Sequence, residues 1–73
     1  MGYNNGDSYK NYAIVSIIKQ LGLGANIRVH FQGQTHTGKY AGLNNGVLIL
    51  NRFVNVNETA YFPVNQITAI DVI

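Results

Sequence analysis

The stretch from Gly33 to Leu50 constrains the fold of this chain more than any other. Thr35 to Ala41 is mostly β-branched, aromatic or polar, and Val47 to Leu50 is an unbroken aliphatic run. These two segments predict neighbouring strands. Residues 42–46 between them, Gly-Leu-Asn-Asn-Gly, tolerate positive φ and predict a turn. Gly38 has no side chain and fits a sharp bend or a close backbone approach. The pattern is typical of a small, strongly bent β-barrel.

A helix is predicted before this stretch, within residues 8–22. Asp7 and Ser8 are suitable N-cap residues, and the polar, glycine-rich residues 1–7 are expected to form a loose tail. The apolar residues that recur at helical spacing are Ile14, Ile17, Ile18 and Leu21. We expect the first three to pack on the open end of the barrel or against an adjoining subunit. The many β-branched residues leave a strand as the alternative.

Five strands are predicted in all. From Asn26 the period changes to two, with Ile27, Val29 and Phe31 on one face. Gln32-Gly33 then turns the chain into the central stretch. The later elements are a hairpin turn at Asn55–Glu58, a strand at Thr59–Phe62 that ends at Pro63, a connection at Val64–Gln66 and a last strand at Ile67–Ile73. The chain thus reads as one domain over residues 1–73, mainly β, with an N-terminal helix and a five-stranded, SH3-like barrel at 25–73.

The composition favours self-association. A core built from 73 residues is marginal, and small domains often add disulfides, metals or partner subunits. Cysteine is absent, and the two histidines and three carboxylates are scattered, so we expect neither disulfides nor a metal or cofactor. Hydrophobic residues make up 47% and charged residues 11%, about half the usual charged share. Oligomerisation is the remaining support. Without a membrane-length apolar run or a signal peptide, we expect a soluble, cytoplasmic protein.

The charged residues favour binding over catalysis. The formal net charge is +2 without a basic cluster, which permits contact with nucleic acid but does not require it. Asp7, Glu58 and Asp71 form no predicted pair, and Gly22-Leu23-Gly24 closes a helix rather than opening one as a phosphate loop does. We expect no catalytic residues and no enzymatic activity.

The order of these elements resembles the Sm-like family, and within it the bacterial Hfq branch. The first Sm motif is similar to Ile27-x-Val29-x-Phe31 followed by Gly33, Gly38, Asn44-Asn45 and Val47–Leu50. The second, shorter motif is similar to Ile67-x-x-Ile70 after the turn at Val64–Gln66. The resemblance covers roughly residues 8–73. It implies an Sm-type barrel and a homo-oligomeric ring of roughly five to seven subunits, joined through the fourth and last strands. It also implies binding of U- or A-rich single-stranded RNA as a scaffold or chaperone.

The resemblance is weakest at the family's uridine pocket, which two turns build. The first turn of the family typically has an aspartate and a stacking side chain, where this chain has Asn44-Asn45-Gly46. The second has Tyr-Lys-His in Hfq or Arg-Gly in its eukaryotic relatives, where this chain has Pro63-Val64-Asn65. The sequence therefore offers amides, but neither an aromatic side chain nor a cation, at these turns.

The candidate RNA-binding residues are Asn44, Asn45, Asn65, Lys39 and Arg52. The asparagine amides could read an unstacked base, and the two cations could contact phosphates. The competing interpretation is that the asparagines serve the turns and the cations lie on a solvated strand face. Tyr40, Tyr61 and Phe62 are expected in the core or at a subunit contact rather than stacked on bases.

Two further functions stay open at this point. One is a ring-forming structural or interaction module that assembles without binding RNA, which the absence of a cation at the second turn favours. The other is a monomeric SH3-like barrel that binds a peptide. The monomer is the weaker alternative, because it would leave sheet edges and apolar surface uncovered.

Overall fold

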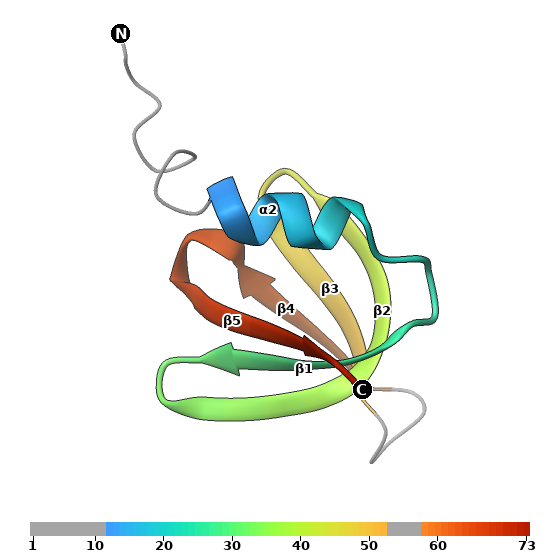
Figure 1. Cartoon of the computed structure of the whole chain (residues 1–73). Helices are drawn as coiled ribbons and strands as arrows, with labels where there is room; N and C mark the ends of the chain where they lie inside the picture. Colours follow the sequence, from blue (N-terminus) through green and yellow to red (C-terminus); the bar gives the residue numbers. More distant parts are fainter. Residues whose placement is uncertain (1–11, 53–57) are drawn as a thin grey trace, which may run out of the picture.

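A helix followed by an antiparallel sheet makes up the described part of the chain, residues 12–52 and 58–73 of the computed structural model (Figure 1). The elements are α2 (Tyr12–Lys19), β1 (Asn26–Phe31), β2 (Gln34–Asn44), β3 (Val47–Arg52), β4 (Thr59–Pro63), the 3₁₀ turn η1 (Val64–Gln66) and β5 (Ile67–Val72). The predicted class, mainly β with a preceding helix and five strands, is confirmed for these residues. The predicted tail, N-cap and most of the turn at 55–58 lie outside them.

The strands form one sheet in the order β4-β3-β2-β1-β5. Each neighbouring pair is antiparallel, and β2 bends strongly along its length (Figure 1). Within the described residues the hydrogen-bonded ladder does not close, so the predicted barrel is an open, curved sheet. Its edges are β4 and β5, which are consecutive in the chain and joined by η1 alone.

Two hairpins of the sheet use two-residue turns with positive φ. Gln32 and Gly33 have φ of 52° and 79°, and Asn45 and Gly46 have φ of 52° and 76°. Positive φ at both turn residues is what a type I′ hairpin requires. The second turn is therefore shorter than the predicted turn over residues 42–46, because β2 stays paired with β3 as far as Asn44.

Gly42 explains why the strand continues through a segment rich in turn residues. Its φ is 146°, and the pairing of β2 with β3 shifts register between Tyr40 and Gly42. A bulge at a glycine bends a strand without ending it. Gly42 thus contributes to the curvature of the sheet and not to the turn.

Gly38 lies on β2 against the backbone of β3. A Cβ atom at this position would collide with the carbonyl oxygen of Asn51. It would also lie 2.9 Å from the carbonyl carbon of Asn51 and 3.0 Å from the Cγ of Leu50. The predicted close backbone approach is confirmed. Only a residue without a side chain lets the two strands pack at this point.

The core lies between α2 and the concave face of the sheet. Its fully buried side chains are Ile18, Ile27, Val29, Leu48 and Leu50, and further buried members are Ile14, Tyr40, Phe62, Val64 and Ile67. Burying an aliphatic side chain of this size contributes about 1.5–3 kcal/mol. Phe31 and Ile70 pack against this cluster from its rim. The alternation predicted for residues 27, 29 and 31 is therefore confirmed.

The helix differs from the prediction at its C-terminal end and on one side. It ends at Lys19 rather than near Leu21, because Gln20 and Leu21 donate to the carbonyls of Ile17 and Ile18, at 3.1 and 3.0 Å. These three-residue spacings tighten the last turn into 3₁₀ geometry. Ile14 and Ile18 are buried as expected, but Ile17 is 38% exposed and does not belong to the core of this chain.

Candidate functional site

The turns at Asn44–Gly46 and Val64–Gln66 lie side by side. The backbone N–H of Val64 donates to the carbonyl of Gly46 at 2.8 Å, and the Val64 side chain is buried. This contact holds the turn that carries Asn44 and Asn45 against the turn that carries Asn65. All three asparagines are exposed. The structure thus brings together three of the five candidate RNA-binding residues. We call the two turns that carry them the asparagine turns.

Asn45 has a backbone role that accounts for its presence independently of any ligand. Its φ of 52° lies in the left-handed region, which asparagine adopts more readily than most residues. Asn44 differs, since it is the last residue of β2 and pairs with Val47. Asn44 and Asn65 are therefore the better probes of a binding role at the asparagine turns.

Lys39 and Arg52 lie away from the asparagine turns. Lys39 is five residues before Asn44 on β2, about 16 Å of strand, and its Nζ donates to Oδ1 of Asn26 at 3.0 Å. Arg52 is at the end of β3 and pairs with Gly38. The five candidate residues therefore do not form one site. The two-residue period of β2 and β3 could have predicted that Lys39 and Arg52 lie on different faces of the sheet. Residue 52 pairs with residue 38 on the concave face, and residue 39 points to the opposite face.

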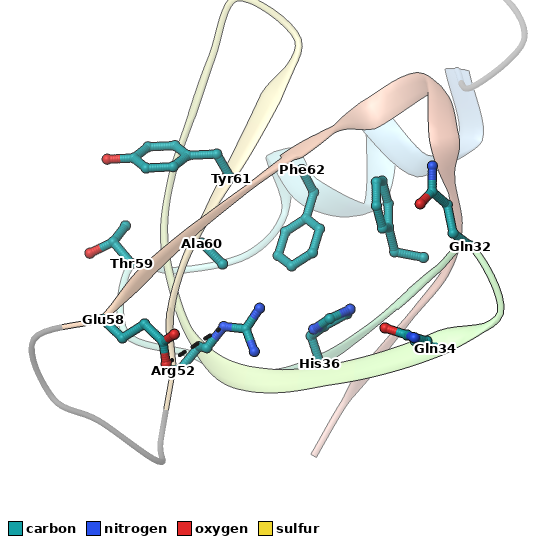
Figure 2. Close-up of a pocket in the computed structure, with 10 residues that line it drawn as sticks. Gln32, Gln34, His36, Arg52, Glu58, Thr59, Ala60, Tyr61 and Phe62 are labelled. Carbon is teal, nitrogen blue, oxygen red and sulfur yellow. Dashed lines mark ion pairs between the residues drawn. The ribbon is translucent and has the colours of Figure 1, made fainter.

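A cavity of about 430 Å³ opens between the β1–β2 hairpin and β4 (Figure 2). We call it the hairpin pocket, and its lining residues are Phe31, Gln32, Gln34, His36, Arg52, Glu58, Thr59, Ala60, Tyr61 and Phe62. The sequence analysis did not identify this site. A signal was present in the two-residue period of β2, which places positions 34 and 36 on the same face as the buried Tyr40.

Three aromatic rings cluster at the floor of the hairpin pocket, where Phe62 is almost fully buried. The ring centroids of Phe31 and Phe62 are 5.1 Å apart in an edge-to-face arrangement, and those of His36 and Phe62 are 5.0 Å apart. Burial, and secondarily the positive charge of Arg52, lower the pKa of His36 below its usual 6.5. His36 is therefore a neutral imidazole near pH 7 and extends an apolar surface with one ring donor and one acceptor.

Arg52 supplies the charge in the hairpin pocket. Its Nε is buried and has no hydrogen-bond partner among the described residues. The nearest oxygen of its ion pair, Oε1 of Glu58, is 3.9 Å away, beyond hydrogen-bond distance (Figure 2). The backbone holds the two residues together, because Arg52 N–H donates to the Glu58 carbonyl at 3.1 Å. A buried donor without a partner is unfavourable, so the site is open to an additional acceptor.

A second charged cluster joins β1 to β5. Oδ2 of Asp71 accepts from Nη1 of Arg28 at 3.1 Å and lies 2.8 Å from Nε2 of His30. The hydrogen bond with His30, followed by that with Arg28, lowers the pKa of the Asp71 carboxyl. The cluster is partly exposed, and it ties the terminal strand to the sheet. Arg28 is thereby committed to a carboxylate rather than presented to solvent alone.

Neither a metal centre nor a membrane span appears in the part of the chain that the structure describes. Residues 12–52 and 58–73 contain no group of three or more histidine, aspartate or glutamate side chains placed to hold an ion. No helix among them is long and apolar enough to cross a bilayer.

The geometry therefore offers two places for a ligand, the exposed asparagine turns and the concave hairpin pocket. The first presents exposed amides, and the second presents clustered aromatic rings beside a guanidinium nitrogen that has no hydrogen-bond partner among the described residues. Comparison of the chain with protein-family models, with curated proteins and with solved structures finds no match.

Proposed function

We propose that this chain is an Sm-like protein that assembles into a homo-oligomeric ring and binds U- or A-rich single-stranded RNA at the asparagine turns. The observation that carries the proposal is the strand order β4-β3-β2-β1-β5 behind an N-terminal helix, with the sheet open at β4 and β5. The resemblance to the Sm-like family implies one helix followed by five strongly bent strands, and the observed elements are compatible with that description. In that family the fourth strand of one subunit pairs with the last strand of the next.

The open edge of β5 supports assembly through backbone hydrogen bonds. The N–H of Ile73 donates to the carbonyl of Asn26 at 3.0 Å, and residues 27 and 72 are paired next to it. Because N–H groups alternate in direction along a strand, those of Ile70 and Val72 point away from β1. They face the edge, where a neighbouring strand would satisfy them. Unpaired edges of this kind are usually covered.

The adjacency of the asparagine turns supports a role in RNA binding. Each subunit would present Asn44 and Asn65 to one unstacked base, and a ring would repeat this weak site around its axis. Repetition raises the overall affinity without any new contact. The positive net charge of each subunit is multiplied in the same way.

A ring-forming scaffold that does not bind RNA is the second candidate function. It is favoured by the separation of Lys39 and Arg52 from the asparagine turns, because neither of these two candidate cations can then contact a phosphate there. The positive φ of Asn45 favours it as well, since the backbone alone accounts for that residue. Both candidates require the same ring.

Native mass measurement of the full chain at micromolar concentration tests the ring. We expect a closed oligomer of about five to seven copies. A population made only of monomers would overturn the proposal. Repeating the measurement with short oligo-U and oligo-A then distinguishes the two candidate functions, because only the first predicts a mass increase.

Fluorescence anisotropy with labelled oligo-U and oligo-A tests the RNA site. The double variant Asn44→Ala, Asn65→Ala removes two amides worth about 1 kcal/mol each, so affinity should fall by tenfold or more. The matched control is Asn51→Ala, which removes an exposed amide on β3. Binding that is unchanged in the double variant places the RNA site elsewhere, and no binding at low salt leaves the scaffold as the function.

A further inference from the structure

We propose that the hairpin pocket is a binding site for a small aromatic carboxylate. The ring would lie against Phe31 and His36, over the buried Phe62, and the carboxylate would accept a hydrogen bond from Nε of Arg52 once the Glu58 side chain moves aside. This site is distinct from the asparagine turns and does not depend on the proposed RNA binding.

The hairpin pocket is large enough for a flat ring that carries a polar group, because polar side chains line more of it than apolar ones. Its volume of about 430 Å³ falls within the usual range of ligand pockets, roughly 300–1,000 Å³. The side chains of His36 and Phe62 point toward one space from opposite sides (Figure 2). Edge-to-face and offset contacts with such rings stabilise an aromatic ligand by about 0.5–1.5 kcal/mol per pair beyond the area that is buried.

The charge of the hairpin pocket calls for an anionic oxygen. Nε of Arg52 is buried without a hydrogen-bond partner among the described residues, while Glu58 neutralises the guanidinium from 3.9 Å. A carboxylate that reaches Nε gains a charge-assisted hydrogen bond that Glu58 does not make. The Glu58 side chain is 49% exposed, so it can move into water when the ligand arrives. Binding would exchange one carboxylate for another on the same cation.

The positions of Gln32 and His36 favour one orientation of the ligand. Nε2 of Gln32 donates to Oε1 of Gln66 at 2.9 Å, which holds the Gln32 side chain at the end of the pocket away from Arg52. His36 is kept neutral and therefore does not compete with Arg52 for the anion. The carboxylate is directed to the Arg52 end, and the ring to the end at Phe31.

A nucleobase fits the hairpin pocket less well than an aromatic acid. A base is neutral, so it would leave Nε of Arg52 without a charged acceptor. The two ligands can be told apart directly, since adenosine carries the ring without the carboxylate.

The test is a titration of the isotope-labelled full chain, followed by NMR, with 2-naphthoate, its neutral amide 2-naphthamide, and adenosine. We expect naphthoate to bind with a dissociation constant on the order of a millimolar or below, as ligand size allows. Shifts should centre on His36, Arg52 and Ala60. Naphthamide and adenosine should each bind at least tenfold more weakly. Equal or tighter binding of either neutral compound, or no saturable shift with naphthoate, overturns the proposal.

Three variants locate the site. Arg52→Gln should weaken naphthoate binding at least tenfold, and Glu58→Gln should tighten it several-fold by removing the competing carboxylate. Lys39→Gln is the matched control, because it changes the net charge as Arg52→Gln does but lies on the other face of the sheet. An equal effect of Lys39→Gln, or no effect of Glu58→Gln, contradicts the site.

Two measurements keep these outcomes separate from folding and from RNA binding. Circular dichroism and thermal melting show whether Arg52→Gln is folded, and if it is not, the Glu58→Gln result decides. Naphthoate binding should persist in the double variant Asn44→Ala, Asn65→Ala. Loss of binding there would mean that the carboxylate occupies the asparagine turns and not the hairpin pocket.

Discussion

Gly38 is a single residue on which the packing of two strands depends. Gly38→Ala would place a methyl group against the backbone of Asn51, which cannot move without disturbing the β2–β3 ladder. We expect a loss of about 1–3 kcal/mol in the free energy of unfolding, measured in urea. Gly22→Ala is the matched control, since nothing lies within 4 Å of the added atom there. Equal stability of both variants would contradict the close approach.

Asp71 makes the stability of the fold depend on pH in a defined direction. Because its pKa is lowered in the folded chain below the usual 3.8, its contribution is present above that pH and is lost as the pH falls through the lower value. Asp71→Asn should therefore melt below wild type at neutral pH, with a difference that shrinks in acid. Glu58→Gln removes one carboxylate elsewhere and serves as the control. A difference that stays constant into strong acid would exclude this linkage.

Residue by residue, the sequence analysis was most successful where the backbone imposes a requirement. Gly38 and the turn at Gln32-Gly33 could be predicted because few residues fit a close approach or a positive φ. The environments of His36 and Arg52 could not be predicted, because both residues share the hairpin pocket with Phe62. Phe62 is distant in the sequence and comes close to them only in the folded chain. No local pattern reports that distant contact.

At the scale of elements, α2 stabilises the fold through one narrow apolar stripe, in which Ile14 and Ile18 are buried. Ile18 is fully buried against the sheet, and Ile18→Ala should lower the free energy of unfolding by about 2–4 kcal/mol through the cavity it leaves. Ile17→Ala is the matched control, with an expected loss below about 1 kcal/mol at its exposed position. Chemical denaturation of both variants tests the difference. A large loss at Ile17 would instead show that a partner subunit covers it.

The ends of the elements were predicted less well than their existence. Glycine and asparagine at residues 42–46 indicated a five-residue turn, but strand pairing carried β2 through a bulge at Gly42. The helix ended early because its last turn tightened after Lys19. Pairing with β3 decided the first boundary and hydrogen bonds within the last turn decided the second, where local composition left both ambiguous.

At the scale of the whole molecule, the open edge of β5 is the feature that a single substitution can test. Val72→Pro removes an N–H that faces away from β1, so the β1–β5 ladder should survive while edge pairing weakens. We expect the proposed ring of the Val72→Pro variant to be weaker, so that it dissociates at protein concentrations at which the wild-type ring stays assembled. Native mass measurement over a dilution series tests this. Val72→Ala keeps the N–H and should behave as wild type. Equal assembly of the two variants would exclude pairing through this donor.

The global arrangement was the part most accessible from the sequence. The order of one helix and five strands followed from a change of hydrophobic period at Asn26 and from turns at glycine, asparagine and proline. Whether the sheet closes on itself could not be derived, because closure depends on the angle between strands that no residue pattern specifies. The ring itself stays a prediction.

The three residues of η1 have a geometric consequence for any assembly built edge to edge. They are the whole chain connection between β4 and β5, and together with the curvature of the three strands between these edges they relate one edge of the sheet to the other by a rotation. Each added copy would repeat this rotation, and the circumference of a closed assembly would follow from it. The buried Val64 and its hydrogen bond to Gly46 anchor this turn to the β2–β3 hairpin. A one-residue insertion in this turn would thus alter how many copies complete the circle while each copy stays folded.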